Sequence, residues 1–481
     1  MNHKDLEFLN VSSFKESIKD LNKELNKDKA QRSVRNRLRS IQHDAQYVTR
    51  IHDILTKEIG QDIPLIANER CGTWYVHPFP KDSLTKTNNQ ITTYFKSTDG
   101  HTNEWTFSFK RLNFHLLDVL SAHHQAGVMI VDSTRRGKTI PDALSKTIPI
   151  WCATLNYFMF GKPTLKVSGD DDKAINGKNW FFYPEKTLSL NEASKIADLI
   201  PQFAKQLQEL NVISKETIKD QLQGKHLKPY WIHPQVRESP LPSFPYTDHI
   251  PLILCCSSER CQDGVKSMTG GWVYVQGAAD DEELWSQGLN YKEFWSNREE
   301  FMNCESEESV IDLIKDIKSS GKGTTDSKSV DELTDITPTL SIGKIVADLS
   351  VSDLQDYDNV IILSKEFKAP PQENDKKNTN TIQHFPLQCN KKGSNDLRKS
   401  LSSIQFSHPQ RTLILDESGK DLSIGVLLIL LVKNYDLDWN ITENPESANK
   451  TIIKQHLAKV NTKKVVNPSR ATLQSVNSYL M

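Results

Sequence analysis

Several features that would place a protein in a functional class at once are missing from this sequence. The formal net charge is −1 over 481 residues, so no overall positive field predicts nucleic-acid binding, and any RNA contact must use local patches. The seven cysteines lack the regular spacing of a disulfide framework. Reduced thiols are typical of proteins inside the cell, so we expect a cytoplasmic protein, with the nucleus as the alternative.

The sequence also shows no segment that would direct it into a membrane. Residues 1–14 have no apolar core of the kind that a signal peptide needs. The longest apolar run, residues 422–432, is too short to span a bilayer and predicts a buried helix instead. We therefore expect no membrane partner, and no obligate protein partner is indicated.

What the sequence does contain is typical of a soluble α/β protein with more than one domain. Apolar residues make up 37% and charged residues 25% of the chain, which is ordinary for globular proteins. Short apolar runs that predict buried strands (VMIV, LILCC and GWVYVQGA) alternate with helical patterns in the first half, and the same alternation returns after a polar stretch. We predict an N-terminal α/β domain over residues 1–305, a linker over 306–338 and a second α/β domain over 339–481.

A basic helix is expected near the N-terminus. Its apolar residues recur at helical spacing: Val34, Leu38, Ile41, Ala45 and Val48. Arg35 and Arg39 lie on the other faces. Those faces are interpreted either as an ordinary solvated surface or as a surface that tracks the phosphates of a nucleic acid.

The stretch that follows the apolar run VMIV has almost the spacing of a nucleotide-binding P-loop, but it begins with Asp132 where that loop has glycine. A side chain at that position disfavours a tight wrap around a polyphosphate. A strand end, a cationic turn and the start of a helix still predict an anion site. The alternative is a basic turn without a ligand. The candidate binding residues are Ser133, Thr134, Arg135, Arg136, Gly137, Lys138 and Thr139.

Other polar clusters follow predicted strands or turns. Lys96 and Asp99 flank a glycine turn, and Arg111 follows shortly after. A second group of candidate ligand residues comprises Ser257, Ser258 and Gln276 at two further strand ends. Asp280 with Asp281 would suit Mg²⁺, or would simply complement the dipole of a helix that starts there.

Residues 416–423 have the spacing of a cysteine-phosphatase loop, with Asp416 in the place of the nucleophile and Leu422 in the place of the arginine. A carboxylate cannot supply the thiolate chemistry. We expect a phosphatase-like fold without phosphatase activity. The loop residues that would face an anion are Ser418, Gly419, Lys420 and Ser423.

These stretches together closely resemble the initiator-tRNA phosphoribosyltransferases of fungi and plants. The similarity includes YFKSTDGHTNEWTFSFKRLNFHLL, VDSTRRGKTIPDALSKTIPIW, GGWVYVQGAADDEELWSQGL and ESGKDLSIGVLLIL, and it extends from about residue 36 to the C-terminus. The resemblance implies a transferase domain followed by a domain like a dual-specificity phosphatase. Its loop departs from the family, which usually has cysteine where this chain has Asp416.

The resemblance also implies a reaction. The enzyme would transfer ribosyl phosphate from 5-phosphoribosyl 1-diphosphate (PRPP) to the 2′-hydroxyl of adenosine 64 in the T-stem of initiator tRNA. Diphosphate leaves with the help of Mg²⁺, and the modification keeps this tRNA out of elongation. The carboxylate that accepts the proton or steadies the sugar cation is Asp132 as the first choice, Asp99 as the second, and His43 is a third candidate.

Contacts with the tRNA are expected from two basic segments, through phosphates, 2′-hydroxyls and shape. One is the N-terminal helix, with Arg35 and Arg39. The other lies near the C-terminus and contributes Lys454, Lys463, Lys464 and Arg470. Lys96 and Arg111 would hold further phosphates of the donor or the RNA backbone. Two alternatives remain open: a tRNA-binding adaptor without catalysis, built from degenerate phosphate loops, and a phosphate-ester hydrolase.

Overall fold

The computed structural model describes residues 24–25, 27–69, 71–78, 91–96, 104–135, 137–163, 176–235, 248–320, 329–370, 381–405 and 410–481. The chain forms two compact units. Unit 1 comprises residues 1–105, 122–200 and 225–323, and unit 2 comprises residues 106–121, 201–224 and 324–481. Two internal segments of the N-terminal half thus belong to unit 2. Among the described residues, no helix has the length and apolar character needed to cross a membrane.

Unit 1 is built on a five-stranded parallel sheet with the order β2-β1-β3-β5-β4. Every residue of β3 and β5 is buried, as expected for a parallel sheet that is covered on both faces. The strands predicted from VMIV and LILCC are therefore found in the centre of this sheet. The bounds are β1 Leu65–Asn68, β2 Thr92–Thr93, β3 Val128–Asp132, β4 His226–Ile232 and β5 His249–Cys256.

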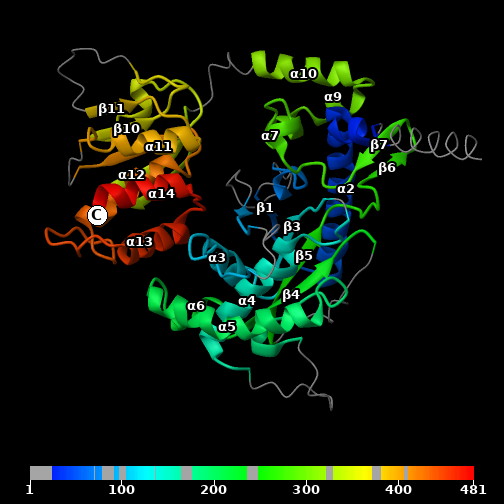
Figure 1. Ribbon diagram of the computed structural model, residues 1–481, viewed down its shortest axis with the longest axis horizontal. Coiled ribbons are helices and arrows are strands. Elements are labelled where there is room, and N and C mark those ends of the chain that lie inside the picture. Colours follow the sequence, from blue (N-terminus) through cyan, green and yellow to red (C-terminus); the bar gives the residue numbers. More distant parts are fainter. Residues whose placement is uncertain are drawn as a thin grey trace, which may run out of the picture. The chain divides into compact units, whose positions relative to one another are not determined.

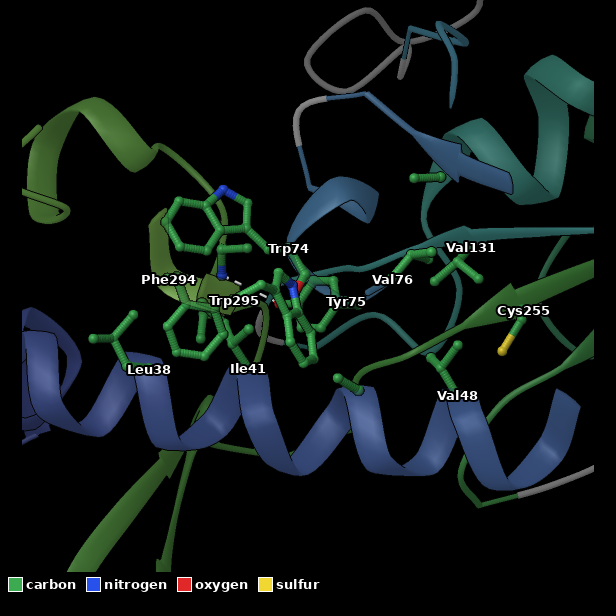
Figure 2. Packing of buried hydrophobic residues seen from close by; sticks show 14 of the residues in the cluster. Leu38, Ile41, Val48, Trp74, Tyr75, Val76, Val131, Cys255, Phe294 and Trp295 are labelled. Atoms are coloured by element: carbon green, nitrogen blue, oxygen red, sulfur yellow. Dashed lines mark hydrogen bonds between the residues drawn. The ribbon is translucent and has the colours of Figure 1, made fainter. Parts of the chain in front are cut away.

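Helix α2 (Val34–Ile59) is the expected N-terminal helix, and its five predicted apolar positions are all buried. Figure 2 shows Leu38 and Ile41 beneath Trp74, Phe294 and Trp295, while Val48 lies toward Cys255 of the sheet. Trp295 also donates its indole N–H to the carbonyl oxygen of Trp74, at 3.2 Å. The helix thus supplies one wall of the unit 1 core.

The segment after the sheet forms a β-hairpin and a series of helices. The strand expected in GWVYVQGA is β7 (Trp272–Val275), and it pairs antiparallel with β6 (Val265–Met268), so it lies outside the parallel sheet. Within residues 306–338, which composition predicts as a linker, lie a helix, α10, and a strand, β8; residues 321–328 are outside the described ones. Helix α10 is ordered on the core because Val310 and Ile314 join the cluster of α2.

The helices of unit 1 pack on its strands and on one another. Helix α4 packs on β4, and α2 packs on β7 and α10 (Figure 1). A π-helical turn, Ala143–Thr147, leads directly into α4. The helices are α4 Ile148–Phe160, α5 Leu190–Leu210, which continues into unit 2, α7 Glu282–Trp285, α8 Tyr291–Ser296, α9 Arg298–Asn303 and α10 Glu307–Ser320, with short 3-10 turns at Gly72–Trp74 and Lys178–Trp180.

Unit 2 has its own five-stranded sheet with the order β11-β10-β12-β9-β8, in which only the β8–β9 pair is antiparallel. The apolar run at 422–432 forms α12, which is buried against β12 and packs on α13 and α14 (Figure 1). The predicted buried helix is therefore present, and it follows strand β12 and a short loop. The strands are β8 Val330–Thr337, β9 Leu340–Ile345, β10 Asn359–Leu363, β11 Thr381–Phe385 and β12 Thr412–Asp416. The helices are α3 His115–Ala122, which ends in unit 1, α6 Lys215–Gln221, α11 Lys391–Ser400, α12 Leu422–Asn434, α13 Lys450–Lys463 and α14 Arg470–Leu480, with a 3-10 turn at Val351–Asp353.

Candidate active site

Asp132 ends β3 at the point where the strand order of unit 1 reverses. The chain places β2 on one side of β1 and β3 on the other, and ligands of parallel α/β sheets bind at the carboxyl edge beside such a reversal. Asn68 ends β1 there and donates its amide to Asp132 Oδ2 at 2.8 Å. The backbone N–H of Ser133 donates to Asp132 Oδ1, also at 2.8 Å. Asp132 is only 6% exposed, and these donors orient and stabilise a charged carboxylate.

The loop that follows Asp132 is held from two sides. Ser258 accepts the N–H of Thr134 and donates to its carbonyl oxygen, both at 3.1 Å. Ser133 donates to the phenol oxygen of Tyr75 at 3.2 Å. On the other side, a Cβ added at Gly277 would lie 2.8 Å from the carbonyl oxygen of Thr134. A side chain there would clash with the loop backbone, so the loop conformation depends on that glycine.

Gln276 and Ser258 act as supports of the loop in this structure. The amide of Gln276 donates to the carbonyl oxygen of Lys138 at 2.8 Å and accepts the N–H of Cys261 at 2.9 Å. Ser257, by contrast, has a fully buried hydroxyl oxygen without a hydrogen-bond partner among the described residues. Its backbone N–H donates to the carbonyl oxygen of Asp132 at 2.9 Å. A buried hydroxyl of this kind at a strand end is suited to a ligand.

Acidic side chains neutralise the two cations of the loop that the structure describes. Arg135 pairs with Asp280 through its Nε and with Asp281 at 3.0 Å. Lys138 pairs with Asp142 at 3.1 Å. The two carboxylates expected to bind Mg²⁺ are thus both paired with one cation of the same loop.

Of the remaining candidates in this region, Gly137, Lys138 and Lys96 are exposed, and Thr139 is partly buried. Thr147 donates its hydroxyl to the carbonyl oxygen of Lys96 at 2.9 Å, so the segment that follows β2 lies beside the π-helical turn. Asp99 and Arg136 fall outside the described residues.

His43 lies on α2 in a polar cluster with Asp44 and Tyr274. Tyr274 donates its hydroxyl to Asp44 at 2.9 Å, and His43 Nδ1 lies 3.4 Å from the same carboxyl. Burial raises the pKa of Asp44 to about 7, and the hydrogen bond with Asp44 raises the pKa of His43. Asp44 was not singled out by the sequence analysis, although its place between apolar Ile41 and Ala45 on the helix marks it as inward-facing.

Four of the cations expected to bind RNA donate hydrogen bonds to backbone carbonyl oxygens of their own unit. Arg35 and Arg39 donate to the carbonyl oxygen of Cys304 at 3.2 Å each, so both hold the end of α9. Lys464 is buried and donates to the carbonyl oxygen of Glu332 at 2.7 Å. Lys463 donates to the carbonyl oxygen of Ile336 at 3.0 Å.

Three other expected binding residues, Arg111, Lys454 and Arg470, belong to unit 2. Arg111 was expected to hold a phosphate of the donor or the RNA backbone, and it belongs to unit 2, where it donates to Asn467 at 3.0 Å. Lys454 and Arg470 are exposed.

In unit 2, the phosphatase-like loop is filled by its own carboxylate. Asp416 is fully buried, and its Oδ1 accepts the N–H of Ser418 at 2.7 Å, the hydroxyl of Ser418 at 2.8 Å and the N–H of Gly419. Its Oδ2 accepts the N–H of Ser423 at 2.6 Å. The carboxylate therefore takes the backbone donors that would bind an oxyanion. Burial raises the pKa of the Cys389 thiol, next to the loop, to about 12, which leaves no thiolate at neutral pH.

The comparisons with known proteins agree with the resemblance. A model of the Rit1 N-terminal domain matches residues 27–319, and a model of the Rit1 DUSP-like (dual-specificity-phosphatase-like) domain matches residues 381–480. A protein of Saccharomyces cerevisiae named tRNA A64-2′-O-ribosylphosphate transferase is 36% identical over 97% of this chain and 95% of its own length. An uncharacterized protein of Schizosaccharomyces pombe is 35% identical over 94% of both chains. The expected α/β transferase fold followed by a phosphatase-like α/β domain is confirmed, and the chain belongs to the Rit1 family.

Proposed function

We propose that this chain transfers ribosyl phosphate from PRPP to the 2′-hydroxyl of adenosine 64 in initiator tRNA, releases diphosphate and so keeps this tRNA out of elongation. The similarity to the yeast transferase covers nearly the whole of both chains. The observation that carries the proposal is the position of Asp132, a buried carboxylate at the strand reversal and immediately before a cationic loop. This combination suits a sugar phosphate that carries a diphosphate, because cations match the phosphates and a carboxylate matches the positive charge that develops on the sugar.

The reaction forms one bond to the anomeric carbon of the donor and breaks another. The 2′-oxygen of the adenosine bonds to that carbon, the bond from the carbon to the diphosphate oxygen breaks, and the 2′-hydroxyl loses its proton. Positive charge develops on the sugar while negative charge develops on the diphosphate. Asp132, held by Asn68 and Ser133, would accept the proton or stabilise the positive sugar. Asp99 and His43 are the alternatives for the proton.

The leaving diphosphate would meet the loop after Asp132. Arg135 and Lys138 supply positive charge, and the buried hydroxyl of Ser257 supplies a hydrogen-bond donor. Lys96, three residues beyond the end of β2, would hold a further phosphate. Because Arg135 is paired with two acids in the free protein, binding of the diphosphate would exchange these partners for phosphate oxygens.

The donor set of Asp280 and Asp281 fits Mg²⁺. Both are carboxylates, the oxygen ligands that this ion prefers, and their charge already attracts the guanidinium of Arg135. The ion would neutralise negative charge on the leaving diphosphate when it is bound. With Arg135 turned toward phosphate, the two acids would become available to the ion.

A comparison of Asp132→Asn with the wild type separates this proposal from the adaptor alternative. The transferase proposal predicts that Asp132→Asn lowers the rate of transfer at least about 100-fold, the usual contribution of a positioned acid or base, with tRNA binding retained. The adaptor alternative predicts that neither protein changes the mass of unmodified initiator tRNA in the presence of PRPP and Mg²⁺. Asp99→Asn and His43→Gln, measured in the same assay, identify which of the three groups the reaction depends on most.

A further inference from the structure

Four cations gather on one surface of unit 2: Lys110, Arg111, Lys454 and Arg470. Arg111 donates its guanidinium to Asn467 Oδ1 at 3.0 Å, three residues before α14 begins at Arg470. Asn461 of α13 donates its amide to the carbonyl oxygen of Lys110 at 3.1 Å. These two contacts fasten residues 110–111 to the segment from α13 to α14. Residues more than 300 positions apart along the chain thus form one basic surface.

The positive charges of this surface repel one another. Lys110, Lys454 and Arg470 are exposed. Partial burial and then the charges of Arg111, Arg470 and Lys454 lower the pKa of Lys110. Within the described part of the chain, Lys110, Lys454 and Arg470 form no ion pair, whereas exposed Lys399 of the same unit pairs with Asp396. Repulsion among like charges is relieved when an external polyanion binds.

We propose that this surface, named here the Lys110 surface, is the docking site of unit 2 for the phosphate backbone of initiator tRNA. The proposal rests on the proposed function for the identity of the RNA. Lysine and arginine side chains at several points of one surface match the phosphates of a duplex arm, which proteins recognise mainly by backbone and shape. Arg111 then serves the RNA and not the donor diphosphate, and Lys110 joins a site that the sequence did not indicate.

The test measures binding of unmodified initiator tRNA to the full chain, without PRPP, over a series of salt concentrations. The variant combines Lys110→Gln, Lys454→Gln and Arg470→Gln, and it leaves Arg111 and its contact with Asn467 intact. The control combines Arg398→Gln, Lys399→Gln and Arg411→Gln, three exposed cations of unit 2 at the end of α11 and just before β12. Both proteins lose the same formal charge, and circular dichroism verifies that each is folded.

The surface variant is expected to weaken tRNA binding by roughly 10- to 100-fold and to lower the salt slope by about 2 to 3, close to one for each lost phosphate contact. The control should bind within about twofold of the wild type, because a general loss of charge has only a small effect. Equal affinity and equal salt slope for the surface variant and the control would overturn the proposal. A preference for acidic polypeptides over tRNA would also overturn it.

Transfer from PRPP is measured separately with saturating tRNA. The control should then keep the wild-type rate, because none of its changed residues belongs to the candidate active site or to the Lys110 surface. If the wild type binds tRNA through this surface but transfers nothing, the proposed function fails while the docking proposal stands. If transfer occurs and the surface variant binds normally, the docking proposal fails alone.

Discussion

Removal of the Asp416 carboxylate should destabilise unit 2 although the residue has no catalytic task. The carboxylate accepts three backbone N–H groups and one hydroxyl inside the loop. In Asp416→Ala these donors lose their acceptor, and each buried donor left unpaired costs about 1–3 kcal/mol. Water that enters the vacated space recovers part of that cost, so we expect a loss of about 2–5 kcal/mol. That is a large share of the roughly 5–15 kcal/mol that holds a typical domain folded.

Hydrogen exchange measured by mass spectrometry suits this prediction, because it reports opening of unit 2 without a contribution from unit 1. Peptides that cover β12 and α12 should exchange about 30- to 5000-fold faster in Asp416→Ala when opening is limited by unit stability. Asp438→Ala is the matched control: its side chain is 90% exposed, and surface substitutions usually change stability by no more than about 0.5 kcal/mol.

Sulfate provides the check on the physical reason. If the amides of the loop form an anion site that Asp416 fills, sulfate should slow the exchange of Asp416→Ala more than that of the wild type or of Asp438→Ala. The general stabilising effect of sulfate acts on all three proteins alike. Exchange in Asp416→Ala at the wild-type rate, or an equal response to sulfate in all three, would refute the reasoning.

Two further predictions concern unit 1. Gly277→Ala should lower the free energy of unfolding by about 1–3 kcal/mol and slow transfer, because its Cβ would lie 2.8 Å from the carbonyl oxygen of Thr134. Thermal unfolding and transfer assays compare it with the control Gly271→Ala, because Gly271 has a similarly positive φ but open space around it. Equal effects of the two substitutions would contradict the clash. Burial raises the pKa of Asp44 from 3.8 to about 7. The folded protein therefore holds this proton more tightly than the unfolded chain does. The stability that the protonated Asp44 contributes is lost as the pH rises from about 4 to about 7. Asp44→Asn should remove that part of the pH dependence in urea unfolding, and an unchanged pH profile would show that the carboxyl does not titrate in this window.

The elements with strong local patterns were predictable from the sequence. Helical spacing identified the buried positions of α2, and continuous apolar runs identified β3, β5 and α12, because each of these segments is buried through its own residues. The position of Asp132 at a strand end followed from the same reasoning. In each case the pattern is local, so no knowledge of distant residues was needed.

What was missed depends on contacts between distant parts of the chain. Residues 106–121 carry no mark that assigns them to unit 2, where Lys110 and Arg111 meet residues 461 and 467. The hairpin partner of β7 is likewise set by tertiary pairing, which periodicity does not reveal. The inward turn of Asp416 was also missed, because spacing shows which residue occupies the nucleophile position but not which way its carboxylate faces.

The central claim is tested most directly by removal of the proposed acceptor atom, the 2′-oxygen of adenosine 64. The full chain is incubated with PRPP, Mg²⁺ and either unmodified initiator tRNA or the same tRNA with 2′-deoxyadenosine at position 64, and RNA fragments are analysed by mass spectrometry. We predict a gain of one ribosyl phosphate on the fragment that contains adenosine 64, and no gain on the deoxy tRNA. An unchanged mass of the normal tRNA with folded, tRNA-binding protein, or an equal gain on the deoxy tRNA, would contradict the account.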